Sequence, residues 1–100
     1  MTLLSREEFE RLLPEGWRVE DNYLVRDVEF KTYMDGINFI NELARIAEAE
    51  EHHPDIIIVW KHITLRLTTH DEGGITELDI RMANLINELI DKWRDRIEEA

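Results

Sequence analysis

The sequence contains no cysteine, and this absence excludes several kinds of chemistry. Disulfide bonds, thiol nucleophiles and thiolate metal ligands all require cysteine. Basic residues are also scarce: 12 Lys and Arg face 23 Asp and Glu in a chain of 100 residues with a formal net charge of -11. Nucleic acids and anionic lipids are bound mainly through clustered basic side chains. We therefore expect no direct nucleic-acid partner and no membrane association.

Long apolar runs and targeting signals are missing as well. No stretch approaches the ~20 apolar residues that a membrane span requires. The first residues lack a basic segment followed by an apolar one, and Glu7, Glu8 and Glu10 interrupt them, so they do not resemble a signal peptide. Only 4 Gly and 2 Pro punctuate the chain, and no linker is apparent. We expect one domain over residues 1–100 and a cytoplasmic location.

The first half of the chain begins with a short helix and then alternates in an extended pattern. Ser5 and Glu8 fit a capping box before a helix that ends near Pro14. Alternating side chains predict two strands over residues 17–20 and 23–31, which the turn pair Asp21-Asn22 joins.

The second half contains two longer helical patterns that flank a second pair of strands. Apolar residues at helical spacing predict a helix over residues 32–51. The β-branched run 56–60 predicts a buried strand, and residues 63–68 predict a half-buried one. A capping box at 76–79 opens a last helix, predicted to extend to Ile97. The order α-β-β-α-β-β-α predicts an α+β domain, with an antiparallel four-stranded sheet and three helices on one face.

Histidines are the main candidates for chemistry, because the chain has no glycine-rich phosphate loop and no nucleophile elbow. A neutral imidazole can both give and take a proton near neutral pH. His52 and His53 stand before Pro54, which breaks helical geometry and would let both rings face one pocket; alternatively, they are exposed residues at a helix end. His70 closes a predicted strand, either as a functional group or as a plain polar residue. His62 is expected to face solvent without a role.

Other candidate residues each have a plainer alternative. Glu48 stands one helical turn before His52 and would orient it, or it is a solvated carboxylate. Asp79 occupies a helix-capping position. Trp60 is a core or interface residue, or an aromatic wall for a flat ligand. Three histidines around a zinc ion are a further alternative, although the sequence has no HExxH motif.

The spacing of these residues resembles that of the pterin-4a-carbinolamine dehydratase family; the matching string is Glu48, His52-His53-Pro54, Trp60, His70 and Asp79. The likeness extends from Gly16-Trp17 over nearly the whole chain. It implies a four-stranded antiparallel sheet backed by three helices, assembled as a homodimer or homotetramer. The implied reaction eliminates water from a 4a-hydroxytetrahydropterin to give quinonoid dihydropterin, which recycles a pterin cofactor. It implies neither a metal nor an organic cofactor.

The resemblance also implies roles for individual residues. His52 and His70 would act as acid and base, while His53 would bind and orient the pterin and assist protonation. The residues implied to contact substrate are Glu51, Pro54, Thr68, Thr69 and Asp71. Supporting roles are implied for Glu48, Trp60 and Asp79. The chain departs from many members in having Trp60 instead of Tyr, and from some in having Leu78 instead of Arg.

An interaction protein is the main alternative to an enzyme. Some members of the family serve as dimerisation cofactors for a transcription factor, and others serve as assembly factors. The last predicted helix offers an apolar stripe wide enough for a partner. A role in dimerisation or assembly without required catalysis therefore stays open, and a zinc-dependent hydrolase is a third hypothesis.

Overall fold

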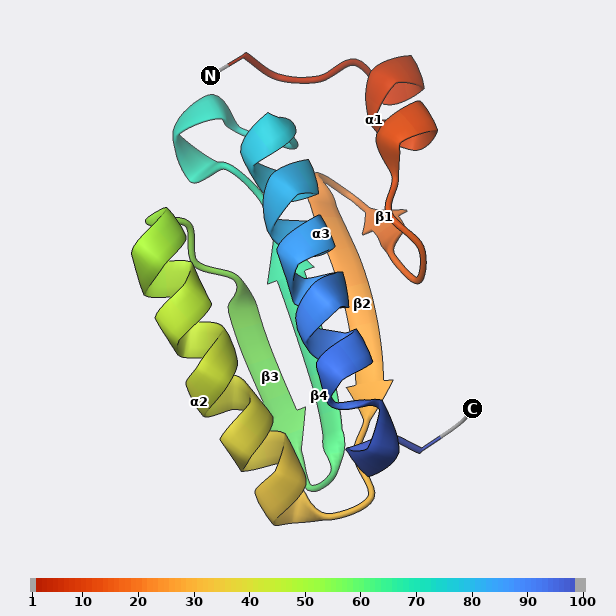
Figure 1. Cartoon of the computed structure of the whole chain (residues 1–100). Coiled ribbons are helices and arrows are strands. Elements are labelled where there is room, and N and C mark those ends of the chain that lie inside the picture. The colour runs from red at the N-terminus through yellow and green to blue at the C-terminus, as the bar shows by residue number, and fades with distance from the viewer. Residues whose placement is uncertain (1, 99–100) are drawn as a thin grey trace.

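The computed structural model describes residues 2–98, which form an antiparallel sheet of four strands and three α-helices (Figure 1). The helices are α1 (Arg6–Leu12), α2 (Tyr33–Glu50) and α3 (Glu77–Lys92), and the strands are β1 (Arg18–Glu20), β2 (Tyr23–Glu29), β3 (Asp55–Val59) and β4 (His62–Leu67). This confirms the predicted α+β class and the order α-β-β-α-β-β-α. The strand order β1-β2-β4-β3 shows that two hairpins meet along β2 and β4.

The core lies between the sheet and the two long helices, which run across one face of it (Figure 1). The side chains of β2 and β4 that point to this face are Leu24, Val28, Ile63, Leu65 and Leu67, and all are buried. The helices contribute apolar side chains that include Phe39, Leu43, Met82 and Ile86. Burying one such side chain stabilises the fold by about 1.5–3 kcal/mol, so this layer fixes the faces of both hairpins.

Helix caps lie where the sequence predicts them. The side-chain oxygen of Ser5 accepts from the backbone of Glu8, and Thr76 and Asp79 form the matching box at the start of α3. Thr32 caps α2 in a simpler way, accepting from the backbone N–H of Asp35 over 3.0 Å. Among residues 2–98, no helix is both long and apolar enough to cross a membrane.

Two predicted elements differ from the structure. The strand predicted to be buried is β3, an edge strand that within residues 2–98 pairs only with β4. The side chains of Ile57 and Val59 are 46% and 67% exposed. The last helix ends at Lys92 instead of Ile97. A 3-10 turn at Arg94–Arg96 redirects the chain, so that Ile97 forms an isolated antiparallel bridge with Phe30, the residue after β2, instead of extending the helical stripe.

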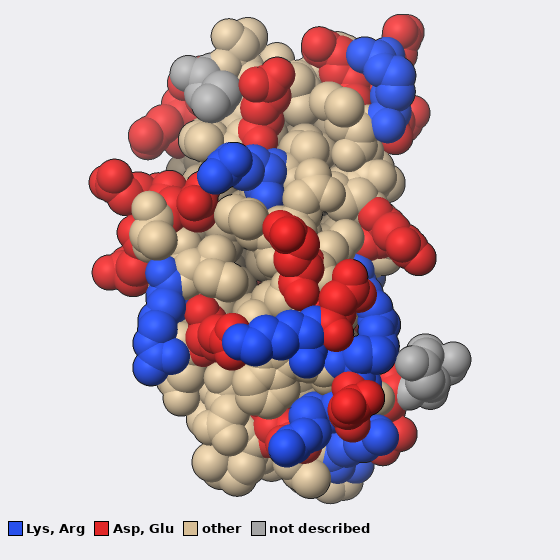
Figure 2. Space-filling view, in the orientation of Figure 1, with Lys and Arg blue, Asp and Glu red and all other residues tan. Residues whose placement is uncertain are grey.

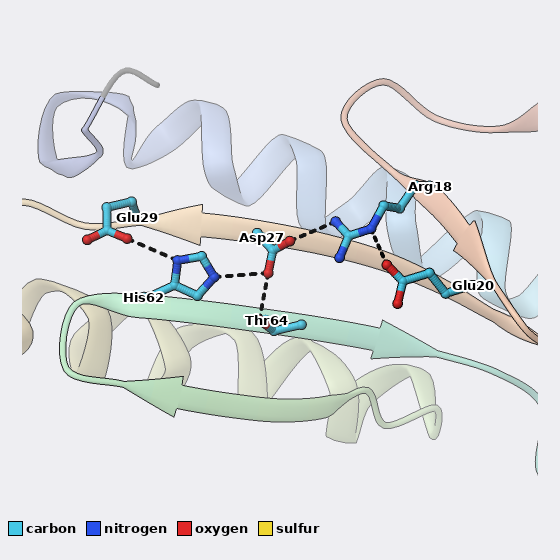
Figure 3. Close-up of polar contacts among 6 residues, drawn as sticks. All are labelled: Arg18, Glu20, Asp27, Glu29, His62 and Thr64. Carbon is cyan, nitrogen blue, oxygen red and sulfur yellow. Dashed lines mark hydrogen bonds and ion pairs between the residues drawn. The ribbon is translucent and has the colours of Figure 1, made fainter.

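The sheet face opposite α2 and α3 carries a polar network centred on His62 (Figure 3). The His62 ring lies between two carboxylates of β2, with Nδ1 3.0 Å from Oε1 of Glu29 and Nε2 3.0 Å from Oδ1 of Asp27. Hydrogen bonds to Glu29 and then Asp27 raise the pKa of His62. Partial burial alone would raise the pKa of Asp27, but hydrogen bonds from Thr64, Arg18 and His62 outweigh it and lower that pKa to about 2. His62 is partly exposed, as predicted, but it is also bound in a network that the sequence did not reveal.

Candidate active site

The end of α2 positions two of the histidines. Glu51 has a left-handed backbone with φ of 53°, and the N–H of His52 donates to the carbonyl of Ala47 over 3.1 Å. This is the pattern of a Schellman-type helix ending. Pro54 follows and cannot continue a helix. His52 and His53 therefore leave the helix at its C-terminus, as the proline predicted.

The third histidine lies in the turn after β4. His70 begins a short 3-10 turn that is closed at its base, where the N–H of Thr69 donates to the carbonyl of Gly74 over 2.9 Å. Gly73 ends the turn with φ of 76°, a conformation that glycine adopts without strain. The His70 ring stands edge-on to Tyr23, with ring centroids 6.4 Å apart. The turn and this aromatic contact hold His70 at the end of the sheet.

These two segments line one pocket of about 300 Å³. The lining residues are Glu51, His52, His53, Thr68, Thr69, His70, Asp71 and Leu78. The pocket thus brings together the three histidines proposed for catalysis and most of the residues implied to contact substrate. Pro54 is buried and is not part of the lining. Acidic side chains project from the surface where α2 ends, on the left of the space-filling view (Figure 2).

A buried carboxylate lies behind His52. Oδ1 of Asp79 is 2.6 Å from Nε2 of His52, and the Asp79 side chain is fully buried. Its other oxygen, Oδ2, accepts from the hydroxyl of Thr69 over 2.8 Å and from the backbone N–H of Thr76 over 2.9 Å. One carboxylate therefore caps α3, as its position in the sequence predicts, and also contacts His52.

Glu48 contacts a different histidine from the one that the sequence indicated. It bonds Nε2 of His53, whereas helical spacing had paired it with His52. The reason is the left-handed conformation of Glu51, which ends α2 before His52. The His52 side chain therefore bonds to Asp79 of α3 instead of to Glu48 of α2. Both members of the Glu48–His53 pair are mostly exposed, and exposed pairs of this kind contribute little stability.

Trp60 and Leu78 occupy positions that the sequence did not fix. Trp60 lies in the turn between β3 and β4, at the opposite end of β3 from His53, and is not among the lining residues. Its ring is exposed and stacks under Nζ of Lys61 at 4.2 Å. Leu78 lines the pocket from the first turn of α3. The sequence singled it out only as a departure from the family pattern.

Two further features bear on where the site is placed. A wider cavity of about 500 Å³ runs along β2 beside Arg26 and Arg94, but it contains none of His52, His53 and His70. We place the candidate site at the smaller cavity because the groups that exchange protons near neutral pH gather there. Among residues 2–98, no three or more His, Cys, Asp or Glu side chains are arranged to hold a metal ion.

Comparison with known proteins identifies the family. The family model described as pterin 4 alpha carbinolamine dehydratase matches residues 2–89. A provisionally named pterin-4-alpha-carbinolamine dehydratase of Mycobacterium sp. (strain JLS) is 45% identical over 94 residues, covering 92% of this chain and 100% of that protein. Another, from Haloarcula marismortui, is 46% identical over 89 residues, covering 89% and 97%. The chain belongs to the pterin-4a-carbinolamine dehydratase family.

Solved structures share the fold. One from Brucella melitensis, described as a transcriptional coactivator/pterin dehydratase, is 32% identical with a TM-score of 0.84, covering 88% of this chain and 98% of that one. A pterin dehydratase-like protein described as a RuBisCO assembly factor in the alpha-carboxysome is 20% identical with a TM-score of 0.59, covering 73% and 84%. The second likeness concerns the fold alone.

Proposed function

We propose that this chain is a dehydratase that removes water from a 4a-hydroxytetrahydropterin, giving quinonoid dihydropterin in the recycling of a pterin cofactor. The observation that carries the proposal is one pocket lined by His52, His53 and His70, in a chain of this family. The volume of about 300 Å³ is at the low end of the range of about 300–1,000 Å³ for small-molecule sites, and suits a bicyclic ring.

The elimination needs two proton transfers and no other chemistry. The bond between C4a and its hydroxyl oxygen breaks, and the oxygen takes up a proton to leave as water. The proton on N5 departs as the C4a–N5 double bond forms. One protonated and one neutral imidazole supply both transfers near neutral pH. We assign these transfers to His52 and His70.

Three further lining residues, His53, Glu51 and Asp71, would bind the ring. His53 is mostly exposed at the rim, where it would orient the pterin and assist protonation. Glu51 and Asp71 bring carboxylates to the same pocket. Carboxylates accept hydrogen bonds, and the pyrimidine half of a pterin presents an amino group and a ring N–H as donors. This arrangement would leave C4a and N5 near the imidazoles.

Stopped-flow measurement of the dehydration of a 4a-hydroxytetrahydropterin tests the proposal. Replacing His52 or His70 with alanine is expected to lower the rate about 10²–10⁴-fold, the usual value of general acid–base catalysis. The matched control is His62→Ala, which removes an imidazole from the opposite sheet face and should leave the rate close to wild type. Wild-type rates in both the His52 and His70 variants would overturn the assignment.

We also propose that the chain forms a homodimer or homotetramer. The edge strand β3 exposes Ile57 and Val59, and Trp60 beside them is 69% exposed. Exposed apolar side chains on an unpaired strand edge are typical of an interface. Val59→Lys should shift sedimentation velocity toward the monomer, whereas a wild-type monomer at micromolar concentration would contradict the proposal.

A stoichiometric complex with another protein, without turnover, would instead favour the interaction role.

A further inference from the structure

We propose that Thr69 and Asp79 form a buried positioning relay that determines which ring nitrogen of His52 carries the proton. The inference rests on the proposed function, because it concerns how His52 is prepared for its proton transfer. The side chains of Thr76 and Asp79 are 0% exposed and Thr69 is 8% exposed. Their hydrogen bonds are therefore shielded from competing water, and each polar atom needs a partner within the group.

The donors and acceptors of this relay have one consistent direction. The carboxylate of Asp79 only accepts, so the hydroxyl of Thr69, 2.8 Å from Oδ2, must donate to it. The single hydroxyl proton of Thr69 is then used. The hydroxyl of Thr76, 2.8 Å from that of Thr69, must therefore donate to Thr69, while its oxygen accepts from the N–H of Leu78. The hydrogen bonds thus run from the hydroxyl of Thr76 to that of Thr69 and end at Oδ2 of Asp79.

The other carboxylate oxygen fixes the state of His52. Oδ1 of Asp79 lies 2.6 Å from Nε2 of His52 and has no proton to give, so Nε2 carries the hydrogen in the neutral ring. Nδ1 then holds the lone pair, and among residues 2–98 the structure gives it no hydrogen-bond partner. His52 lines the pocket, so its neutral form would take a proton at Nδ1, and the buried negative charge of Asp79 would stabilise the resulting imidazolium.

This arrangement assigns Thr69 a different role from direct binding. Thr69 lines the pocket, but its hydroxyl is directed to Asp79 and Thr76. Capping alone does not explain the arrangement, because capping α3 uses only Oδ2 of Asp79. The capping box of α1 works at the surface with Ser5 and Glu8. The burial of Asp79 and the contact with His52 go beyond what a cap requires.

Asp79→Asn tests the relay through the tautomer of His52. In the wild type, the hydroxyl of Thr69 and the N–H of Thr76 both donate to Oδ2 of Asp79. In the variant, the amide oxygen of the asparagine should therefore occupy the position of Oδ2, because only an oxygen can accept both bonds. The NH₂ group then faces Nε2 of His52 and would donate to it. The neutral ring should therefore change from the Nε2–H to the Nδ1–H tautomer. Long-range ¹H–¹⁵N spectra of ¹⁵N-histidine-labelled protein, at a pH where the imidazoles are neutral, measure this change.

The rate is the second readout. With Nδ1 protonated, the pocket loses its proton acceptor, and the dehydration rate should fall about 10²–10⁴-fold. Retention of the Nε2–H tautomer in Asp79→Asn would overturn the relay, and so would an inverted tautomer with a wild-type rate. The spectrum does not depend on turnover. If the wild type shows no dehydration, the proposed function fails, while the tautomer change still supports or overturns the relay.

Thr69 variants provide a test that keeps the carboxylate. Thr69→Val removes one donor from Oδ2 and should make the Nε2 proton of His52 exchange faster with water, with a rate of dehydration about tenfold lower. Thr69→Ser keeps the hydroxyl and should restore both values. Thr68→Val is the matched spectroscopic control, because the hydroxyl of the equally buried Thr68 donates to the carbonyl of Asn22 instead of to Asp79. Equal spectra for the two valine variants would contradict the relay.

Discussion

Replacing Gly16 with alanine tests whether a backbone turn and a partly buried arginine depend on each other. Gly16 has φ of 84°, and a Cβ atom built on it would lie 2.4 Å from Nη1 and 2.5 Å from Cζ of Arg26. Nη1 of Arg26 donates to the carbonyl of Glu15 over 2.9 Å and to Oδ1 of Asn87 over 2.7 Å. The guanidinium cannot move away from the new methyl group without losing these bonds.

Two costs add in this variant. A left-handed backbone costs alanine about 1 kcal/mol relative to glycine. A hydrogen bond to a charged group contributes about 1.5–3 kcal/mol, and a displaced guanidinium recovers part of this from water, so we expect a further loss of about 1–3 kcal/mol. The free energy of unfolding should fall by about 2–4 kcal/mol in total.

Gly73→Ala is the matched control for the backbone cost. Gly73 has φ of 76°, and a Cβ atom there would meet nothing within 4 Å. Urea denaturation followed by tryptophan fluorescence gives the free energy of unfolding of both variants. The Gly73 variant should lose only about 1 kcal/mol, and equal losses at the two positions would refute the reasoning. In an Arg26→Met background, the cost of Gly16→Ala should fall to that of Gly73→Ala.

Three further predictions concern the charged network and a helix cap. Because the folded pKa of His62 is raised above 6.5, its ion pairs stabilise the fold fully below that value. In urea denaturation, the difference in free energy of unfolding between wild type and His62→Gln should therefore shrink as the pH rises through the raised pKa. A difference that stays constant with pH would contradict this. The pKa of Asp27 is lowered from 3.8 to about 2, so above this interval its ionised form should add about 1–2 kcal/mol to the free energy of unfolding, after allowance for solvent screening. Acid titration of the stability of wild type and Asp27→Asn should show this contribution disappearing as the pH falls through the same interval. Parallel stability curves for the two proteins would argue against it. Ser5→Ala should lower the free energy of unfolding by about 0.5–2 kcal/mol, measured in urea, and no loss would mean that α1 does not depend on its cap.

Local signals predicted most of the fold. The caps at Ser5 and Thr76 have sequence signatures because a side-chain oxygen and a carboxylate three residues later satisfy free N–H groups. The burial of β3 was predicted wrongly because a β-branched run suits central and edge strands alike. Only the order β1-β2-β4-β3 reveals that β3 has one neighbour, and strand order is not a local property.

Contacts that depend on register or on an unusual backbone were not predictable from spacing. The pairing of His62 with Glu29 follows from the register of β2 on β4, where these two residues are direct partners. Glu48 contacts His53 instead of His52 because Glu51 has a left-handed conformation, and glutamate is a residue type that does not signal that conformation. The pairing of Glu48 with His52 assumed that α2 continues to His52, but α2 ends two residues earlier, at Glu50.

The convergence of the histidines follows from the β3–β4 hairpin. Asp55 is the register partner of Arg66, so the start of β3 lies beside the end of β4. Continuing this register outward by three residues brings His52 level with Thr69, which precedes His70. A hairpin thus makes the residue before its first strand a neighbour of the residue after its second, however long the strands are. Because a slip of one residue would turn alternate side chains to the wrong face, the buried side chains of β4 also hold the two sides of the pocket in alignment.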